Sequence, residues 1–93
     1  MDRGEYLLTY IHHDTYQKFL QRNFYRLEDV TNSRRDVELN IRYLLKLGVK
    51  NVDYVVMERI EDLLLLHHDF VLKMEEYLKS LSIEEVIDML ENS

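Results

Sequence analysis

The sequence contains no cysteine, no proline and only two glycines. A chain without cysteine has no disulfide framework and no thiolate for catalysis or metal binding, so we expect it in a reducing compartment, the cytoplasm. The scarcity of proline and glycine removes the residues that form tight hairpin turns and flexible linkers, which disfavours an all-β fold and a multidomain chain. Residues 1–93 are therefore expected to form a single helical domain.

Long apolar runs and positive charge are scarce as well. The apolar run from Leu63 to Leu66 is far shorter than the roughly 20 residues of a membrane-spanning helix, so we expect no membrane partner. Only 12 Lys and Arg residues oppose 18 Asp and Glu residues, which gives a net charge of −6. Such a chain repels phosphate backbones as a whole, so binding of nucleic acid would require a local basic face.

What the sequence has in abundance is helical periodicity. Apolar residues recur at intervals of three and four positions, the spacing of one buried helix face, as in Tyr16, Phe19, Leu20, Phe24 and Leu27. The sequence therefore predicts an all-α fold, a compact array of about six short helices. Their expected positions are about residues 4–11, 15–28, 34–47, 52–65, 70–81 and 83–91.

Residues that cap helices separate these segments. Ser82 and Glu85 have the spacing of a capping box, and Gly48 is expected to end a helix in a left-handed conformation. The expected side-chain caps at helix starts are Asp14, Ser33, Asn51, Asp69 and Ser82.

The tripeptide His-His-Asp occurs twice, at residues 12–14 and 67–69. Each copy follows an apolar turn and places its Asp where the next helix is expected to begin, so capping is the preferred interpretation. A metal site needs converging ligands, whereas adjacent residues on a helix diverge by about 100°. We therefore predict no metal and no other cofactor. The alternative is a four-histidine cluster, if the two copies meet in space, made of His12, His13, His67 and His68.

The chain also resembles itself at two offsets. A shift of 34 residues places YLLKLGVKNVDYVV (43–56) over YLKSLSIEEVIDML (77–90), and the apolar positions coincide. A shift of 36 residues places YQKFLQRNFYRL (16–27) over VDYVVMERIEDL (52–63) with the same result. Periods of this length are typical of stacked helix pairs, and the chain has room for about two and a half of them.

The segments NIRYLLKLGV, VDYVVMERIEDLLLL and FVLKMEEYLKSLSIEEVIDML resemble the helical repeats of the mitochondrial transcription termination factor family over residues 40–90. The Leu47-Gly48 turn between two helices, and an apolar pair before a short connection, carry the resemblance. It implies a helical-repeat fold and nucleic-acid binding. The chain departs from the family pattern where Ile60-Glu61 replaces the usual proline and Ser82 replaces a glycine. It also has fewer repeats and an acidic C-terminal half.

No motif indicates catalysis. The sequence has no Gly-rich phosphate loop and no nucleophile motif. It also lacks the Glu-x-x-His pairs of a ferritin-type metal centre. We therefore expect no enzymatic activity.

The first functional hypothesis is a non-enzymatic protein–protein interaction module. Residues 51–93 hold eleven acidic and three basic side chains, which favours a basic partner. Seven tyrosines cannot all be buried in a domain of this size, so some are expected to contact a protein partner or a second copy of the chain. The expected contact residues are Tyr25, Tyr43, Tyr54, Tyr77, Glu58, Glu61 and Asp62.

The alternative hypothesis is a small nucleic-acid-binding helical-repeat protein. Basic residues cluster between positions 22 and 46, and helical spacing places several on shared faces, which predicts one positive strip on two adjacent helices. The strip would contain Arg22, Arg26, Arg34, Arg35, Arg42 and Lys46. The simpler interpretation is that these residues form ion pairs with nearby carboxylates: Glu28, Asp29, Asp36 and Glu38.

Overall fold

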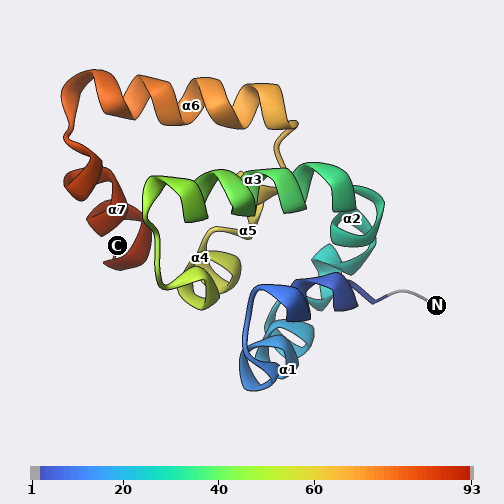
Figure 1. Cartoon of the computed structure of the whole chain (residues 1–93). Helices are drawn as coiled ribbons and strands as arrows, with labels where there is room; N and C mark the ends of the chain where they lie inside the picture. Colours follow the sequence, from blue (N-terminus) through green and yellow to red (C-terminus); the bar gives the residue numbers. More distant parts are fainter. Residues whose placement is uncertain (1–2, 93) are drawn as a thin grey trace.

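The computed structural model describes residues 3–92, which form an all-helical fold without strands (Figure 1). This confirms the predicted all-α class. No helix in this range is long and apolar enough to cross a bilayer. In chain order the elements are η1 (Glu5–Thr9), α1 (His13–Arg22), η2 (Phe24–Arg26), α2 (Leu27–Asn32), α3 (Arg34–Leu47), α4 (Val52–Glu58), α5 (Ile60–Leu63), α6 (His67–Ser80) and α7 (Ile83–Asn92), where η marks 3₁₀ helices.

Four of the expected helices are present as single elements. Helix α3 matches residues 34–47, α7 lies within one residue of 83–91, and α6 begins three residues before the expected 70–81. The helix expected at residues 4–11 is the shorter 3₁₀ helix η1. It follows Gly4, whose φ of 73° is a left-handed conformation that glycine adopts without steric cost.

The two remaining expected helices are each divided into shorter elements, residues 15–28 into parts of α1, η2 and α2, and residues 52–65 into α4 and α5. Residues 15–28 divide at Asn23, with φ −121° and ψ 27°, and residues 52–65 divide at Arg59, with φ −131° and ψ 32°. At each break the N–H donates at 2.8 Å to a carbonyl four residues earlier, that of Phe19 or Val55. Asn23 and Arg59 are 36 residues apart, the offset at which the sequence resembles itself. The break at Asn23 leads into the 3₁₀ helix η2, whereas the break at Arg59 leads into the α-helix α5.

The helix pairs stack on one another. Helix α3 packs against α6, while α4 packs against both α1 and α7. In Figure 1, α3 and α6 run side by side and α4 lies between α1 and α7. Element η1 packs on α1, and Tyr10, the residue that follows η1, donates a hydrogen bond from its hydroxyl to Glu38 of α3. These contacts make the helices one compact array, as expected.

One hydrophobic core extends through all the layers. Full burial of a large apolar side chain stabilises the fold by about 1.5–3 kcal/mol. The largest completely buried side chains come from almost every element: Leu7, Phe19, Ile41, Leu44, Leu63, Phe70, Met74 and Leu90.

Several predicted caps are confirmed. At the start of α7, the Ser82 hydroxyl accepts from the Glu85 N–H and the Glu85 carboxylate accepts from the Ser82 N–H. At α4, Asn51 Oδ1 accepts from the Tyr54 N–H. Helix α3 ends at Gly48, whose φ of 119° and N–H bond to the Leu44 carbonyl close the last turn.

Capping by Asp14, Asp69 and Ser33 was also expected, and this prediction is wrong. Helices α1 and α6 begin at His13 and His67, so each Asp lies inside the first turn instead of before it. Ser33 does precede α3, but its hydroxyl forms no capping bond. Asp14 and Asp69 still stabilise the N-termini of α1 and α6, because a negative charge in the first turn interacts favourably with the helix dipole.

Carboxylates from other helices bind the starts of α1 and α6 instead. Asp53 of α4 accepts from the His12 N–H at 2.9 Å, and Asp36 of α3 accepts from the His67 N–H at 2.9 Å. Each His-His-Asp stretch therefore marks a place where the start of one helix is fixed to another helix.

Asn40 of α3 holds the connection between α5 and α6. It is fully buried, and its amide nitrogen donates to the carbonyls of Leu63 and Leu65, both at 2.9 Å. Its Oδ1 lies 2.9 Å from His67 Nδ1. Because the amide nitrogen is used as a donor, Oδ1 is the acceptor and His67 Nδ1 carries the hydrogen. Both ends of the amide are therefore used.

We expect Asn40→Ala to lower the free energy of unfolding by about 2–4 kcal/mol, because two main-chain carbonyls lose their donor. Asn32→Ala, at the exposed end of α2, should change it by less than about 0.5 kcal/mol. Urea denaturation followed by circular dichroism measures both. Equal and small losses would show that the Asn40 bonds do not stabilise the fold.

Candidate functional site

The two helix breaks lie on either side of a cleft. It has a volume of about 420 Å³, within the usual range for sites that bind small molecules or a few side chains. One wall comes from α1 and η2, and the other from α4 and α5. The lining residues are Arg22, Asn23, Tyr25, Met57, Glu58, Arg59, Ile60, Glu61 and Asp62.

A second hollow, of about 300 Å³, continues the cleft along α1 and α4. It shares three lining residues with the first, which are Arg22, Met57 and Glu58. Its other lining residues are Thr15, Lys18, Asn51, Asp53 and Tyr54. The two hollows together are called the α1–α4 groove below.

Charged side chains pair across this groove. Arg22 of α1 lies 3.4 Å from Glu58 of α4, and Arg26 of η2 pairs with Glu61 of α5. Arg26 also lies 3.4 Å from Asp29. Partly exposed pairs of this kind each contribute at most about 1 kcal/mol to stability, so their main effect is on the electrostatics of the groove. Two residues of the expected basic strip therefore neutralise two residues of the expected acidic surface.

Asp62 is paired as well, at the end of the groove where α5 begins. Its carboxylate lies 2.7 Å from Lys73 Nζ and 3.5 Å from the Arg59 guanidinium. The same guanidinium donates to the Met89 carbonyl of α7 at 3.1 Å. Asp62 and Arg59 thus fix the groove to α6 and α7.

Two adjacent aromatic residues project from η2. Phe24 is 69% exposed and Tyr25 is 67% exposed. Helical spacing predicts burial of Phe24, and that prediction is wrong because the break at Asn23 turns η2 out of line with α1. Tyr25 lines the cleft, and the Arg26 guanidinium carbon lies 5.6 Å from its ring centroid. Cation–π contact of this kind holds the ring against the protein surface.

The other expected contact tyrosines are half-buried. Tyr54 lines the α1–α4 groove. Tyr43 and Tyr77 pack against the core, and the Tyr43 ring meets Phe70 edge-on with centroids 5.8 Å apart. Burial raises the pKa of the Tyr43 hydroxyl. The structure therefore gathers Tyr25 and Tyr54 at the groove and leaves Tyr43 and Tyr77 in helix packing.

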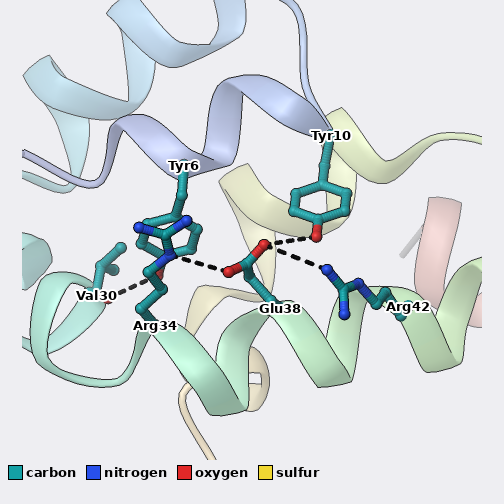
Figure 2. Close-up of polar contacts among 6 residues, drawn as sticks. All are labelled: Tyr6, Tyr10, Val30, Arg34, Glu38 and Arg42. Carbon is teal, nitrogen blue, oxygen red and sulfur yellow. Dashed lines mark hydrogen bonds and ion pairs between the residues drawn. The ribbon is translucent and has the colours of Figure 1, made fainter.

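On α3, a single carboxylate gathers several side chains (Figure 2). Glu38 lies 2.9 Å from Arg34 Nε and 3.8 Å from Arg42 Nη2, and it accepts a 2.7 Å hydrogen bond from the Tyr10 hydroxyl. The Tyr10 bond, followed by that from Arg34, lowers the pKa of Glu38. Arg34 also stacks on the Tyr6 ring at 5.2 Å. These contacts confirm the simpler interpretation for Arg34 and Arg42.

Three basic residues of α3 form an exposed row, and one of them is the Arg42 that pairs with Glu38. Arg35, Arg42 and Lys46 are exposed along one face with Leu39 between them, and this row is called the α3 ridge below. Among residues 3–92, neither Arg35 nor Lys46 has an ion-pair partner. The expected strip is therefore divided. Arg22 lines the α1–α4 groove and Arg26 pairs with Glu61, which also lines it, whereas the other basic residues belong to α3.

The histidine pairs have separate partners. His12 Nδ1 lies 3.0 Å from Asp53, whereas His67 Nδ1 faces Asn40. Within residues 3–92 no group of three or more His, Cys, Asp or Glu side chains is placed to hold a metal ion. The four-histidine alternative therefore has no support in the geometry.

No protein-family model matches the sequence, and comparisons with curated proteins and with solved structures give no significant match. The resemblance of residues 40–90 to the repeats of the mitochondrial transcription termination factor family therefore stays a prediction. The α1–α4 groove and the exposed surfaces are the features of the described residues that bear on function.

The Tyr10–Glu38 bond predicts a pH-dependent contribution to stability. Because the Glu38 pKa is lowered in the folded state, its contribution is present above the pKa of an unfolded glutamate and is lost as pH falls through the folded pKa. We expect Tyr10→Phe to lower the free energy of unfolding at pH 7 by about 1 kcal/mol. The difference from the wild type should shrink at acidic pH.

Urea denaturation at pH 7 and at pH 3 measures this effect. Tyr77→Phe is the matched control, because Tyr77 is half-buried and its hydroxyl forms no hydrogen bond within residues 3–92. A Tyr10→Phe loss that is the same at both pH values would contradict the role of Glu38.

Proposed function

We propose that the chain is a non-enzymatic interaction module that binds a protein partner in the α1–α4 groove. The observation that carries this proposal is the exposed pair Phe24 and Tyr25 beside the cleft. Large aromatic side chains are enriched in protein interfaces and among the residues that contribute most to affinity. Exposure of two of them next to a concave surface supports a binding role.

The charges of the groove support a basic partner. The Glu61 side chain is 70% exposed and that of Glu58 is 40% exposed, although each is paired with an arginine. A lysine or arginine of the partner can share these carboxylates, and the net charge of −6 favours its approach. The proposed contact residues are Phe24, Tyr25, Tyr54, Glu58 and Glu61, with Asp62 fixing the end of the groove.

The proposal includes no cofactor and no catalytic step. We propose the cytoplasm as the compartment, because a chain without cysteine needs no oxidising environment to fold. A second copy of the chain is one of the partners that the test below can identify.

Affinity capture from a lysate of the source cell tests the proposal. Immobilised wild type, the double variant Phe24→Ala/Tyr25→Ala, and Leu72→Ala are compared by quantitative mass spectrometry at physiological salt, after nuclease treatment. Leu72 is the control because it is an exposed apolar residue of α6, away from the groove. We expect specific proteins to be retained by wild type and Leu72→Ala, and to fall at least about tenfold with the double variant.

Two results would argue against the proposal. Retention of the same proteins by all three baits would show that the aromatic pair is not the contact. Loss with Leu72→Ala alone would place the binding surface on α6.

The α3 ridge supports a second candidate function, binding of nucleic acid. Arg35 and Lys46 are exposed and have no ion-pair partner among residues 3–92, so they are available for phosphate contacts. Arg34 is engaged with Glu38, and Arg22 and Arg26 are engaged in the groove. Because the chain as a whole is negatively charged and repels phosphates, contact with nucleic acid would be confined to the α3 ridge.

Fluorescence anisotropy with a labelled 20-base-pair DNA, and with RNA of the same sequence, tests this candidate between 50 and 200 mM salt. For each phosphate contact removed from DNA, the slope of log K against log salt should fall by about 0.9. The triple variant Arg35→Ala/Arg42→Ala/Lys46→Ala should therefore reduce the slope by about 2–3. Lys79→Ala serves as the control, because Lys79 is an exposed lysine of α6 that lies outside the α3 ridge. An unchanged slope in the triple variant would exclude the α3 ridge.

A further inference from the structure

A small basic hollow lies where α6 begins against α3. It has a volume of about 240 Å³ and is called the His67 hollow below. Two of its lining residues are cations and none is a carboxylate, although the chain as a whole is acidic. None of them lines the α1–α4 groove. The lining residues are Leu39, Arg42, Tyr43, Lys46 and His67.

Asn40 fixes the orientation and the tautomer of the His67 ring. The Asn40 side chain is fully buried, and its Oδ1 lies 2.9 Å from His67 Nδ1. Because the amide nitrogen of Asn40 already donates to two carbonyls, Nδ1 carries the hydrogen and donates to Oδ1. In the neutral ring, Nε2 is therefore the nitrogen with the free lone pair.

This lone pair is accessible from outside the protein. His67 is half-buried, and its Nε2 forms no hydrogen bond within residues 3–92. In the same range, the buried polar side-chain atoms without a partner belong to Arg26 and Arg59, so His67 Nε2 is not a buried atom. Since Nδ1 is turned towards buried Asn40, the opposite edge of the ring, which carries Nε2, is the part that faces the hollow.

The charges of the hollow select what Nε2 can react with. A neutral imidazole nitrogen binds a metal ion or attacks an electrophile. Arg42 and Lys46 repel a metal cation, and the carboxylate that contacts His67, Asp36, binds its main-chain N–H and does not line the hollow.

The same two cations attract an anionic reactant. Lys46 has no ion-pair partner within residues 3–92, and Arg42 lies as far as 3.8 Å from Glu38, so both are available for a new contact. A phosphoryl group combines negatively charged oxygens with an electrophilic centre, and it is the reactant that such a site suits.

We infer that His67 accepts a phosphoryl group at Nε2 from a donor of the phosphoramidate class. The lone pair of Nε2 forms a bond to phosphorus while the phosphorus–nitrogen bond of the donor breaks. The donor reacts with its nitrogen protonated, so the bonding pair leaves with that nitrogen as a neutral amine and the imidazole ring takes up the positive charge.

The surroundings of His67 stabilise the product of this step. Nδ1 keeps its hydrogen and its bond to Asn40 Oδ1, and a hydrogen bond from a charged ring is stronger than one from a neutral ring. Arg42 and Lys46 supply positive charge for the phosphoryl oxygens, the usual means of stabilising phosphoryl transfer in proteins.

Phosphoramidate itself, incubated with the full chain near neutral pH, tests the inference. Peptide mapping by mass spectrometry under alkaline conditions, which preserve phosphohistidine, gives the rate at each histidine. We expect His67 to react at least about tenfold faster than His13 and His68. Those two histidines are exposed and lie outside the hollow, so accessibility alone would favour them over half-buried His67.

Charge variants test the role of the two cations. Both are exposed, so Arg42→Gln/Lys46→Gln should fold, and thermal unfolding checks this. We expect the rate at His67 to fall at least about tenfold in this variant, with the rate at His13 unchanged. Arg35→Gln is the matched control, because it removes the same charge from the same face of α3 but outside the hollow, and should react as the wild type does.

Phosphorus NMR identifies the nitrogen that is modified. We expect an Nε2-linked phosphoryl group on His67, because Nδ1 is bonded to Asn40. The resonance should be missing from His67→Gln, whose amide can still donate to Asn40. Linkage to Nδ1 would contradict the tautomer on which the inference depends.

Three further results would overturn the inference. One is a rate at His67 no faster than at the exposed histidines, and another is a rate at His67 that does not change in Arg42→Gln/Lys46→Gln. The third is phosphoramidate that binds in the hollow without transfer to His67. The proposed function is tested separately by Phe24→Ala/Tyr25→Ala, because the His67 hollow and the α1–α4 groove share no lining residue.

Discussion

Every helix end leaves main-chain groups without a partner inside the helix, and this fold depends on supplying partners from other helices. The connections are short and contain little glycine and no proline. Asp53 and Asp36 bind the N–H groups that precede or open α1 and α6. Glu91 of α7 binds the N–H groups of Lys50 and Asn51 before α4. Because each bond joins two elements, the ends of the helices and their packing are fixed together.

A helix break also produces the candidate binding surface. At Arg59 the helix is interrupted and the side chain reaches the main chain of α7. At Asn23 a similar interruption turns η2 aside, which exposes Phe24 and Tyr25 beside the cleft. A continuous helix would have buried Phe24 on the apolar face of α1. The candidate site therefore results from the break.

Local features of the sequence predict much of the fold. Periodicity located α3 to the residue, and the Ser82–Glu85 box and Gly48 were predictable because their partners are within four positions. The two breaks were not predictable, because apolar spacing continues through them and neither proline nor glycine marks them. The caps that come from Asp36 and Asp53 are 31 and 41 positions away from the histidines they bind, so no local pattern reveals them.

The candidate site was predicted in part for the same reason. Tyr25, Glu58 and Glu61 were expected at a contact surface, and they do line one cleft. The pairing of Glu58 with Arg22 and of Glu61 with Arg26 joins residues that are 36 and 35 positions apart in the sequence. Helical spacing predicts which charged residues share a face of one helix. It does not predict which residues of another helix lie opposite that face.

The stacking of helix pairs also bears on how the chain folds. Helices α3 and α4 contact elements on both sides, whereas η1 with α1, and α6 with α7, have neighbours on one side only. In such a linear array each end unit can lose order while the remaining interface persists, but loss of the central unit removes both interfaces at once. Helices α3 and α4 are therefore the elements on which the contacts of both ends depend.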